Sequence, residues 1–166
     1  MIKVGIVGVS GYSGATALEL LLKHPNVRVT YVSANNTTGK IADIWPQLSG
    51  KTDLYCDKVD VKKAVELCDA AFLALPHTTS MTLTPKLLDA GLSVIDLSGD
   101  YRLSSAQYQK WYGAPHTDAA NLKKAVYGLP ELYRENIKKA KLISNPGCYP
   151  TAALLGLAPA VSVHGE

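Results

Sequence analysis

The chain opens with MIKVGIVGVSGYSG, residues 1–14, and continues with ATALELLLKH, residues 15–24. The Val- and Ile-rich run predicts a strand, the glycines at positions 8, 11 and 14 predict a tight turn, and the Ala/Leu-rich run predicts a helix. This order is typical of a dinucleotide-binding unit, in which a pyrophosphate approaches the turn and the helix N-terminus. The spacing is GxxGxxG and not the commoner GxGxxG, so a turn that only packs the helix on the strand remains the alternative.

Strand-like and helical runs alternate along the rest of the chain. Strands are predicted at residues 27–33, 70–75, 92–97 and 141–144, and helices at 61–67, 79–90, 104–112 and 134–139. Ser104 or Ser105 caps the third of these helices, and residues 127–132 are a loop or short strand. A long polar connection covers residues 34–60. The pattern predicts an α/β fold with a Rossmann-like, doubly wound, mostly parallel sheet.

Polar or glycine-containing clusters follow each predicted strand. They cover residues 8–14, 33–39, 76–79, 98–102 and 145–148. Ligands of such folds bind outside the carboxyl ends of parallel strands. We therefore expect one shared cleft along this rim.

Cys148 lies in SNPGCYPT, residues 144–151, where a Pro-Gly turn delivers a thiol to the start of an apolar helical run. A helix N-terminus favours the thiolate, and its free N–H groups can hold an oxyanion. A lone cysteine is more often a small buried hydrophobe, but the dinucleotide motif favours a nucleophile. Cys68 is predicted in the core and Cys56 in a polar loop; the spacing of the three predicts no metal site.

Composition excludes several classes of protein. The chain has 166 residues, 47% of them hydrophobic and 19% charged, and a net charge of +3. Its basic residues are scattered, so nucleic acid is not an expected partner. The sequence shows no apolar stretch long enough for a membrane span and no signal peptide. We expect a cytoplasmic protein with reduced thiols.

Five motifs carry a resemblance to a known family. They are GVSGYSG at residues 8–14, ALPH at 74–77, DLSGDYRL at 96–103, YGLPEL at 127–132 and SNPGCYPT at 144–151. In this order they resemble the N-acetyl-gamma-glutamyl-phosphate reductases of arginine biosynthesis. Aspartate-semialdehyde dehydrogenase and a lysine-pathway reductase share that architecture and cysteine chemistry.

The resemblance implies an NADPH-dependent oxidoreductase, a semialdehyde dehydrogenase that reduces an acyl phosphate to an aldehyde through a thioester on Cys148. Asn145 and the backbone N–H groups around Cys148 and Tyr149 are candidates for holding the oxyanion. Arg102 is a candidate for the phosphate or carboxylate of the substrate, with a structural salt bridge to Asp96 or Asp100 as the alternative. His77 is expected close to the cofactor or reacting centre, unless it is an incidental surface group.

Cofactor contacts are expected along the same rim. The candidates are Gly8, Ser10, Gly11, Tyr12, Ser13 and Gly14 in the turn, Ser33, Asn35 and Lys40 after the second strand, and Pro76. An NAD site usually presents an acid to the ribose after the second strand. Residues 33–40 contain none, and the first one downstream is Asp43, which favours NADP. The family often has an arginine near Asn35, so hydroxyls, amides or Lys40 must serve the 2′-phosphate here.

The resemblance also implies a second domain for substrate binding and dimerisation, largely absent from this sequence. Residues 1–147 are expected to form the dinucleotide-binding domain and residues 148–166 the nucleophile-bearing start of the second. We expect a small-molecule acyl phosphate as substrate, a homo-oligomer at full length, and little activity from this part alone. A related reductase of aspartyl or aminoadipyl substrates, a non-catalytic nucleotide-binding module, or a subunit that completes its site with a separate chain remain alternatives. His116 is predicted either to contact substrate or to cap a turn.

Overall fold

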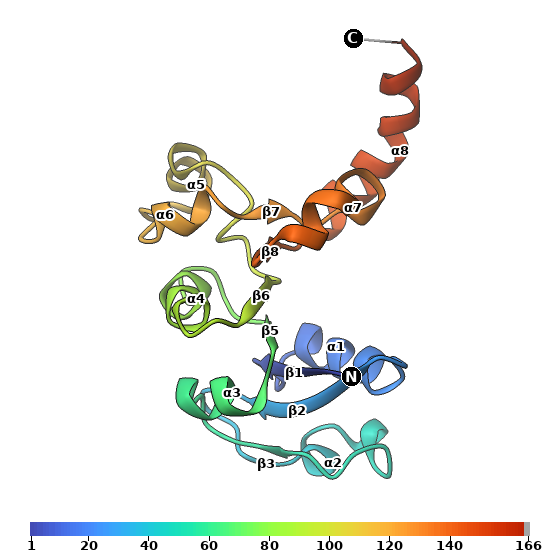
Figure 1. The fold of residues 1–166 in the computed structure, drawn as a ribbon, viewed down its shortest axis with the longest axis vertical. Helices are drawn as coiled ribbons and strands as arrows, with labels where there is room; N and C mark the ends of the chain where they lie inside the picture. Colours follow the sequence, from blue (N-terminus) through green and yellow to red (C-terminus); the bar gives the residue numbers. More distant parts are fainter. Residues whose placement is uncertain (165–166) are drawn as a thin grey trace.

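The structure is a computed structural model that describes residues 1–164 (Figure 1). Its central sheet contains, within those residues, six strands in the order β2-β1-β5-β6-β8-β7, and every neighbouring pair is parallel. The strands are β1 (Ile2–Val7), β2 (Val27–Ser33), β5 (Ala70–Leu73), β6 (Ser93–Asp96), β7 (Val126–Tyr127) and β8 (Leu142–Ser144). The strand order reverses after β1, as in doubly wound folds, so the predicted fold is confirmed.

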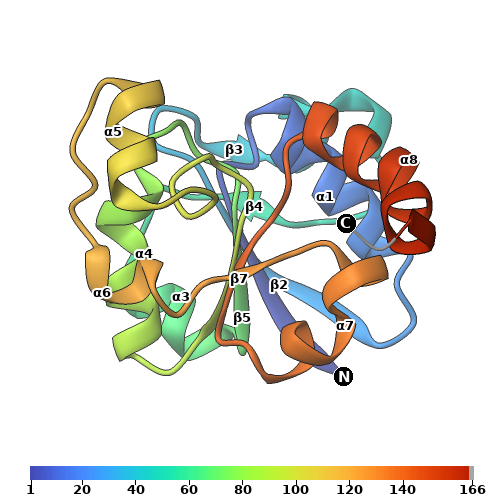
Figure 2. The ribbon, with the colours of Figure 1, turned by 90° about the horizontal axis from the view of Figure 1, so that it is seen from above.

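Helices cover both faces of the sheet (Figure 2). The α-helices are α1 (Tyr12–Leu22), α2 (Ile41–Ile44), α3 (Val61–Leu67), α4 (Ser80–Asp89), α5 (Ser105–Tyr112), α6 (Ala119–Leu122), α7 (Pro130–Lys139) and α8 (Cys148–His164). Figure 2 shows α3, α4, α5 and α6 on one side of the sheet and α1, α7 and α8 on the other. The predicted Ser104 cap of α5 is confirmed, because its side chain accepts the N–H of Gln107.

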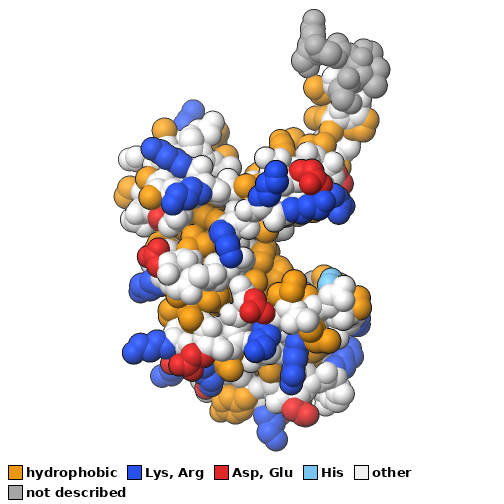
Figure 3. All heavy atoms as spheres, in the orientation of Figure 1, with side chains coloured by type: hydrophobic (Ala, Val, Ile, Leu, Met, Phe, Trp, Pro, Cys, Tyr) orange, Lys and Arg blue, Asp and Glu red, His pale blue; other side chains and the backbone are white. Residues whose placement is uncertain are grey.

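The two faces of the sheet are buried to different extents. Side chains facing α3 and α4, such as Leu73 and Val94, are fully buried, whereas the alternating Phe72 and Ile95 are only partly buried. On the second face, Leu18 of α1 packs in a cluster with β1 and β2. Apolar side chains line the recess between the α1 and α7 regions in Figure 3. This open face lies beside the carboxyl end of β8.

The connection between β2 and α3 is not the polar loop that the sequence predicts. It forms a two-stranded antiparallel sheet of β3 (Gly39–Lys40) and β4 (Tyr55–Cys56), with α2 and the 3-10 turn Pro46–Leu48 between them. The prediction for Cys56 was therefore wrong: the residue is fully buried in β4, and its thiol donates to the carbonyl of Thr37 at 3.3 Å. Burial of Ile41 and Leu48 stabilises this segment.

Helix α8 extends away from the rest of the protein (Figure 1). Its sequence, CYPTAALLGLAPAVSVH, is apolar around the whole circumference. Leu157 is 62% exposed and Val161 is 55% exposed. A helix that is apolar all round is normally buried on every side, so α8 presents a surface suited to contact with further protein.

Candidate active site

The glycine turn between β1 and α1 is built by close backbone contacts. Gly8 has a φ of +96°, and a Cβ added there would lie 2.1 Å from the carbonyl oxygen of Ala74. A Cβ on Gly14 would lie 2.3 Å from the carbonyl oxygen of Gly8, whereas Gly11 has room, with 3.6 Å to the same atom. Two of the three glycines are therefore required by geometry. The contact with Ala74 also brings the loop after β5 against the turn.

The N-terminus of α1 is suited to bind an anion. Its N-cap is Gly11, which has no side chain to cap the helix, and the first turn contains no acidic residue. The first-turn N–H groups thus remain for a ligand such as a pyrophosphate. Tyr12 and Ser13 are exposed there, Ser10 is partly buried, and Gly14 is buried. The cradle fits a dinucleotide.

The residues after β2 are arranged differently from the sequence prediction. Ser33 is fully buried; its carbonyl accepts the N–H groups of Gly8 and Val9, and its hydroxyl has no partner among residues 1–164. Asn35 and Lys40 are exposed, as a cofactor contact requires. Asp57 was not among the predicted residues; it bridges to Ser33 through the backbone, because β4 returns beside β2.

The carboxylate of Asp57 forms a salt bridge with Lys63 of α3. The hydrogen bond and the charge of Asp57 raise the pKa of Lys63. The one acid that the tertiary structure adds beside β2 is thus already paired with a cation. Residues 33–40 contain no carboxylate, as the sequence indicated. Asp57 does not supply a free one, because its carboxylate is paired with Lys63.

The loop after β5 carries Pro76 and His77, both exposed at the rim. The Nδ1 atom of His77 accepts the N–H of Gly99 at 3.1 Å, and the ring contacts Tyr112 edge-on with centroids 4.6 Å apart. His77 is therefore not an unattached surface group. Neither partner was predictable from the sequence, because both contacts join segments that are distant in the chain.

The cysteine turn, residues 145–148, follows β8. The N–H of Asn145 donates to the carbonyl of Asp96 at 2.8 Å, and the Asn145 side-chain amide donates to the carbonyl of Pro146 at 3.0 Å. Cys148 is the first residue of α8, is exposed and forms no disulfide. Tyr149 is 87% exposed. The predicted placement of the thiol at a helix start is confirmed.

Arg102 connects the loop after β6 with the cysteine turn. Its Nε donates to the carbonyl of Asn145 and its Nη2 to the carbonyl of Leu97, both at 2.8 Å. The alternative of a salt bridge with Asp96 or Asp100 was wrong, since no such ion pair forms among residues 1–164. The guanidinium consequently retains donors, and a positive charge, for an anion.

The buried acids near Arg102 have other partners. Burial raises the pKa of Asp96, although hydrogen bonds from the N–H and the hydroxyl of Ser98 oppose this shift.

His116 lies in the loop between α5 and α6. It is buried, and its Nδ1 accepts the N–H of Asp118 at 3.1 Å. The turn-capping interpretation of His116 is therefore confirmed. Cys68 is buried as predicted, and burial raises the pKa of its thiol.

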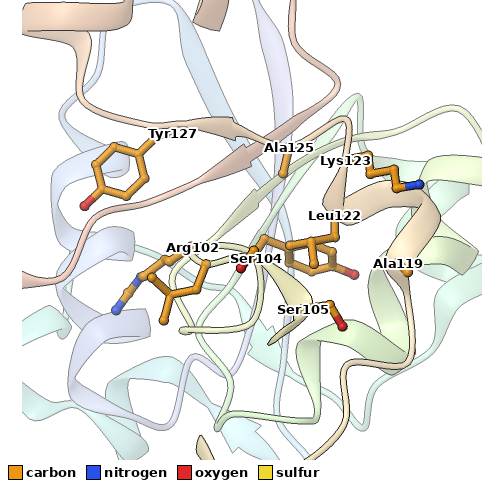
Figure 4. A pocket seen from close by; sticks show the side chains of 10 residues that line it. Arg102, Ser104, Ser105, Ala119, Leu122, Lys123, Ala125 and Tyr127 are labelled. Atoms are coloured by element: carbon orange, nitrogen blue, oxygen red, sulfur yellow. The ribbon is translucent and has the colours of Figure 1, made fainter. Parts of the chain in front are cut away.

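Two cavities border these elements. One, of about 600 Å³, is lined by Tyr12 and Ser13 of α1 together with Asn145, so the glycine turn and the cysteine turn share one side of the sheet. The other, of about 390 Å³, is mainly apolar and was not predicted; Figure 4 shows Arg102 and Tyr127 on one side of it and Lys123 on the other. Arg102 thus borders both the second cavity and the cysteine turn.

Two types of feature are absent from the part of the chain that the structure describes. No helix among residues 1–164 is long and apolar enough to cross a membrane. Over the same range, no group of three or more His, Cys, Asp or Glu side chains is arranged to hold a metal ion.

Curated relatives match nearly all of this chain. The N-acetyl-gamma-glutamyl-phosphate reductase of Gloeobacter violaceus is 49% identical over 160 residues, which cover 95% of this chain and 46% of the relative. The reductase of the same name from Pseudomonas aeruginosa PAO1 is 49% identical over 161 residues, covering 96% of this chain and 47% of the relative. The chain thus spans about half the length of these relatives.

Solved structures show the same fold. Aspartate semialdehyde dehydrogenase with NADP from Candida albicans superposes with a TM-score of 0.76 at 19% identity, over 100% of this chain and 48% of that one. Aspartate semialdehyde dehydrogenase II from Vibrio cholerae, complexed with ASA, gives a TM-score of 0.66 at 19% identity, over 98% and 47%. Residues 3–140 match the family model "Semialdehyde dehydrogenase, NAD binding domain". With a glycine turn shaped for a nicotinamide dinucleotide, the chain belongs to the semialdehyde dehydrogenase NAD-binding domain family.

Proposed function

We propose that this chain is the cofactor-binding, nucleophile-bearing part of an NADPH-dependent N-acetyl-gamma-glutamyl-phosphate reductase, a cytoplasmic enzyme of arginine biosynthesis. The observation that carries the proposal is the exposed Cys148 at the first residue of α8, on the side of the sheet where α1 begins. Identity of 49% to reductases of this name supports this substrate over an aspartyl one, since the aspartate semialdehyde dehydrogenases are only 19% identical.

The residues at the carboxyl ends of the strands suggest how the cofactor would be held. The first-turn N–H groups of α1 would hold the pyrophosphate. Asn35 and Lys40 would hold the 2′-phosphate, because both are exposed and residues 33–40 contain no acidic residue. The bound nicotinamide supplies a hydride. Pro76 and His77 border the glycine turn through the contact of Ala74 with Gly8.

The thiolate of Cys148 would attack the acyl carbon of the substrate. The new C–S bond replaces the C–O bond to phosphate, which leaves with the bonding electrons, and a thioester remains on Cys148. Hydride addition to the thioester carbon and protonation of its oxygen give a thiohemiacetal. Loss of the hydroxyl proton to water and cleavage of the C–S bond then release the semialdehyde and regenerate the thiolate.

The other candidate residues surround this sulfur. The N–H groups of Cys148 and Tyr149, at the free start of α8, would stabilise the oxyanion, a contribution of about 3 kcal/mol per donor. Asn145 would contribute its amide after rotation away from the carbonyl of Pro146. Arg102 would bind the departing phosphate or a substrate carboxylate through the donors that its two carbonyl contacts leave free.

The apolar surface of α8 supports a division of the chain at the cysteine. We assign residues 1–147 to the dinucleotide-binding domain and residues 148–166 to the start of a catalytic and dimerisation domain. In the whole protein, burial of exposed side chains such as Leu157 would accompany formation of a homo-oligomer with a complete acyl-phosphate site.

The cofactor assignment is tested by titrating this chain with NADPH and NADH. We expect NADPH to bind at least about tenfold more tightly, a difference of roughly 1.4 kcal/mol. Lys40→Ala is expected to reduce this preference, whereas Lys23→Ala, at the far end of α1, is the matched control for loss of a cation. Equal affinity for the two cofactors would contradict the NADP assignment.

The role of Cys148 is tested with the acyl phosphate itself. We expect the chain to release up to one equivalent of inorganic phosphate and to gain the mass of the acyl group on Cys148, without rapid turnover. Cys148→Ser should release none above the spontaneous hydrolysis of the substrate. A chain that binds NADPH but gives no Cys148-dependent phosphate would contradict the assignment of Cys148 as the nucleophile and would favour a nucleotide-binding module.

A further inference from the structure

Thr78, directly after His77, has an unusual backbone conformation. Its φ is +69°, and among residues 1–164 it is the one non-glycine residue with a positive φ. A β-branched side chain is strongly disfavoured in this left-handed region. Strain of this kind persists only where surrounding contacts determine the conformation.

Asp100 supplies those contacts from the loop after β6. Its Oδ1 accepts the backbone N–H of Thr78 at 2.9 Å and the hydroxyl of Tyr108 at 2.8 Å, and its Oδ2 accepts the N–H of Met81 at 3.0 Å. Asp100 is fully buried. The carboxylate therefore caps the start of α4 from a residue 22 positions away from Thr78 and holds the strained peptide in place.

The same loop determines which ring nitrogen of His77 carries the proton. The N–H of Gly99, the neighbour of Asp100, donates to Nδ1 of His77. A nitrogen that accepts a hydrogen bond has no proton, so the neutral ring is protonated on Nε2. The edge-on contact with Tyr112 fixes the plane of the ring. Nε2–H is thus a donor, and the ring has no free basic nitrogen.

We infer that Asp100 is a positioning residue: by holding Thr78 in the left-handed conformation, it fixes His77 as an Nε2–H donor to an oxygen of the bound ligand. The statement about the ligand rests on the proposed function. It is supported by the loop itself, since Ala74, three residues before His77, contacts the glycine turn at Gly8. His77 then orients a carboxamide or phosphate oxygen and does not act as a general base.

The tautomer can be measured on this chain without any ligand. In the wild type at alkaline pH, we expect the nitrogen-15 NMR signals of His77 to show an unprotonated Nδ1 and a protonated Nε2. In Asp100→Asn we expect both signals to move toward a mixture of tautomers, because Asn cannot accept all three hydrogen bonds. We also expect NADPH affinity to fall about tenfold, the effect of losing one well-oriented hydrogen bond.

Two further variants separate positioning from general stability. Asp118→Asn removes another buried acid, which contacts Tyr101 and Asn121 but not the loop of His77. We expect it to lower the stability to urea while leaving the His77 signals unchanged. Thr78→Gly in the Asp100→Asn background removes the strain, and we expect it to restore part of the His77 signal pattern and of the NADPH affinity.

The outcomes distinguish this inference from the proposed function. Wild-type His77 protonated on Nδ1, or His77 signals in Asp100→Asn identical to those of the wild type, would overturn the inference even if NADPH binds. If the signals respond as expected but the wild type binds no NADPH, the positioning of His77 by Asp100 is supported and the proposed function fails.

Discussion

The two helices that begin at the rim of the sheet, α1 and α8, are supported in different ways. The turn before α1 contains close contacts among its own glycines, with Gly11 donating to Gly8 and Gly14 packed against the Gly8 carbonyl, and backbone contacts with Ser33 and Ala74 complete it. The turn before α8 is held by Arg102, 43 residues away from Asn145 in the sequence. The contacts among the glycines are local, so the first turn can be identified from its motif. The turn that contains Cys148 is held by a side chain from a distant segment, so its conformation depends on the whole fold.

The largest effect is expected from Gly8→Ala. A Cβ at Gly8 would lie 2.1 Å from the carbonyl oxygen of Ala74, and the positive φ disfavours any side chain. We expect the free energy of unfolding in urea to fall by about 3–5 kcal/mol. Gly11→Ala, with 3.6 Å of space, is the matched control and should cost about 1 kcal/mol or less. Equal costs would show that the turn does not depend on close backbone packing.

Truncation of a leucine should destabilise the protein much more in α1 than in α8. Leu18 of α1 is fully buried, so Leu18→Ala should lower the free energy of unfolding by about 2–4 kcal/mol. Leu157 of α8 is 62% exposed, so Leu157→Ala should change it by less than about 0.5 kcal/mol. Urea denaturation of both variants measures the contrast. A large cost at Leu157 would mean that α8 is packed in solution.

Removal of Arg102 should loosen the cysteine turn alone. Arg102→Ala deletes the donors to the carbonyls of Asn145 and Leu97, and we expect a loss of about 1–3 kcal/mol. Amide hydrogen exchange should accelerate at residues 145–151 and stay unchanged at residues 8–14. Arg102→Lys, which keeps the charge but not the forked geometry, should be intermediate. Uniform acceleration at both turns would contradict the contrast between them.

The smallest effect concerns pH. Burial raises the pKa of Asp96, so the folded chain binds this proton more tightly than the unfolded chain. Stability should therefore decrease as pH rises from the unfolded pKa of about 3.9 through the folded value. Asp96→Asn should flatten this part of the curve of unfolding free energy against pH. Asp69→Asn is the control, because this acid is exposed and its carboxylate accepts only the N–H of Lys3 among the described residues. This variant should retain the decrease in stability with rising pH. A curve for Asp96→Asn that follows the wild type would exclude Asp96 as the source.

Several site features were predictable from the sequence because they depend on neighbours in the chain. The glycine turn, the start of α8 at Cys148 and the Ser104 cap are of this type. The errors arose where the chain returns to pair with a distant segment. Cys56 was assigned to a polar loop, but β4 pairs with β3 and buries it.

The sequence by itself determined the parallel α/β fold, the family and the rim on which the chemistry-bearing residues gather, because hydrophobic periodicity, glycine conformation and helix starts are local properties. Only the tertiary structure decided that Arg102 holds the cysteine turn, that Asp100 holds Thr78, and that Lys63 pairs with Asp57. Hydrogen bonds of this kind have short range and strict geometry. No sequence pattern can specify which partner lies within 3 Å until the strands are aligned.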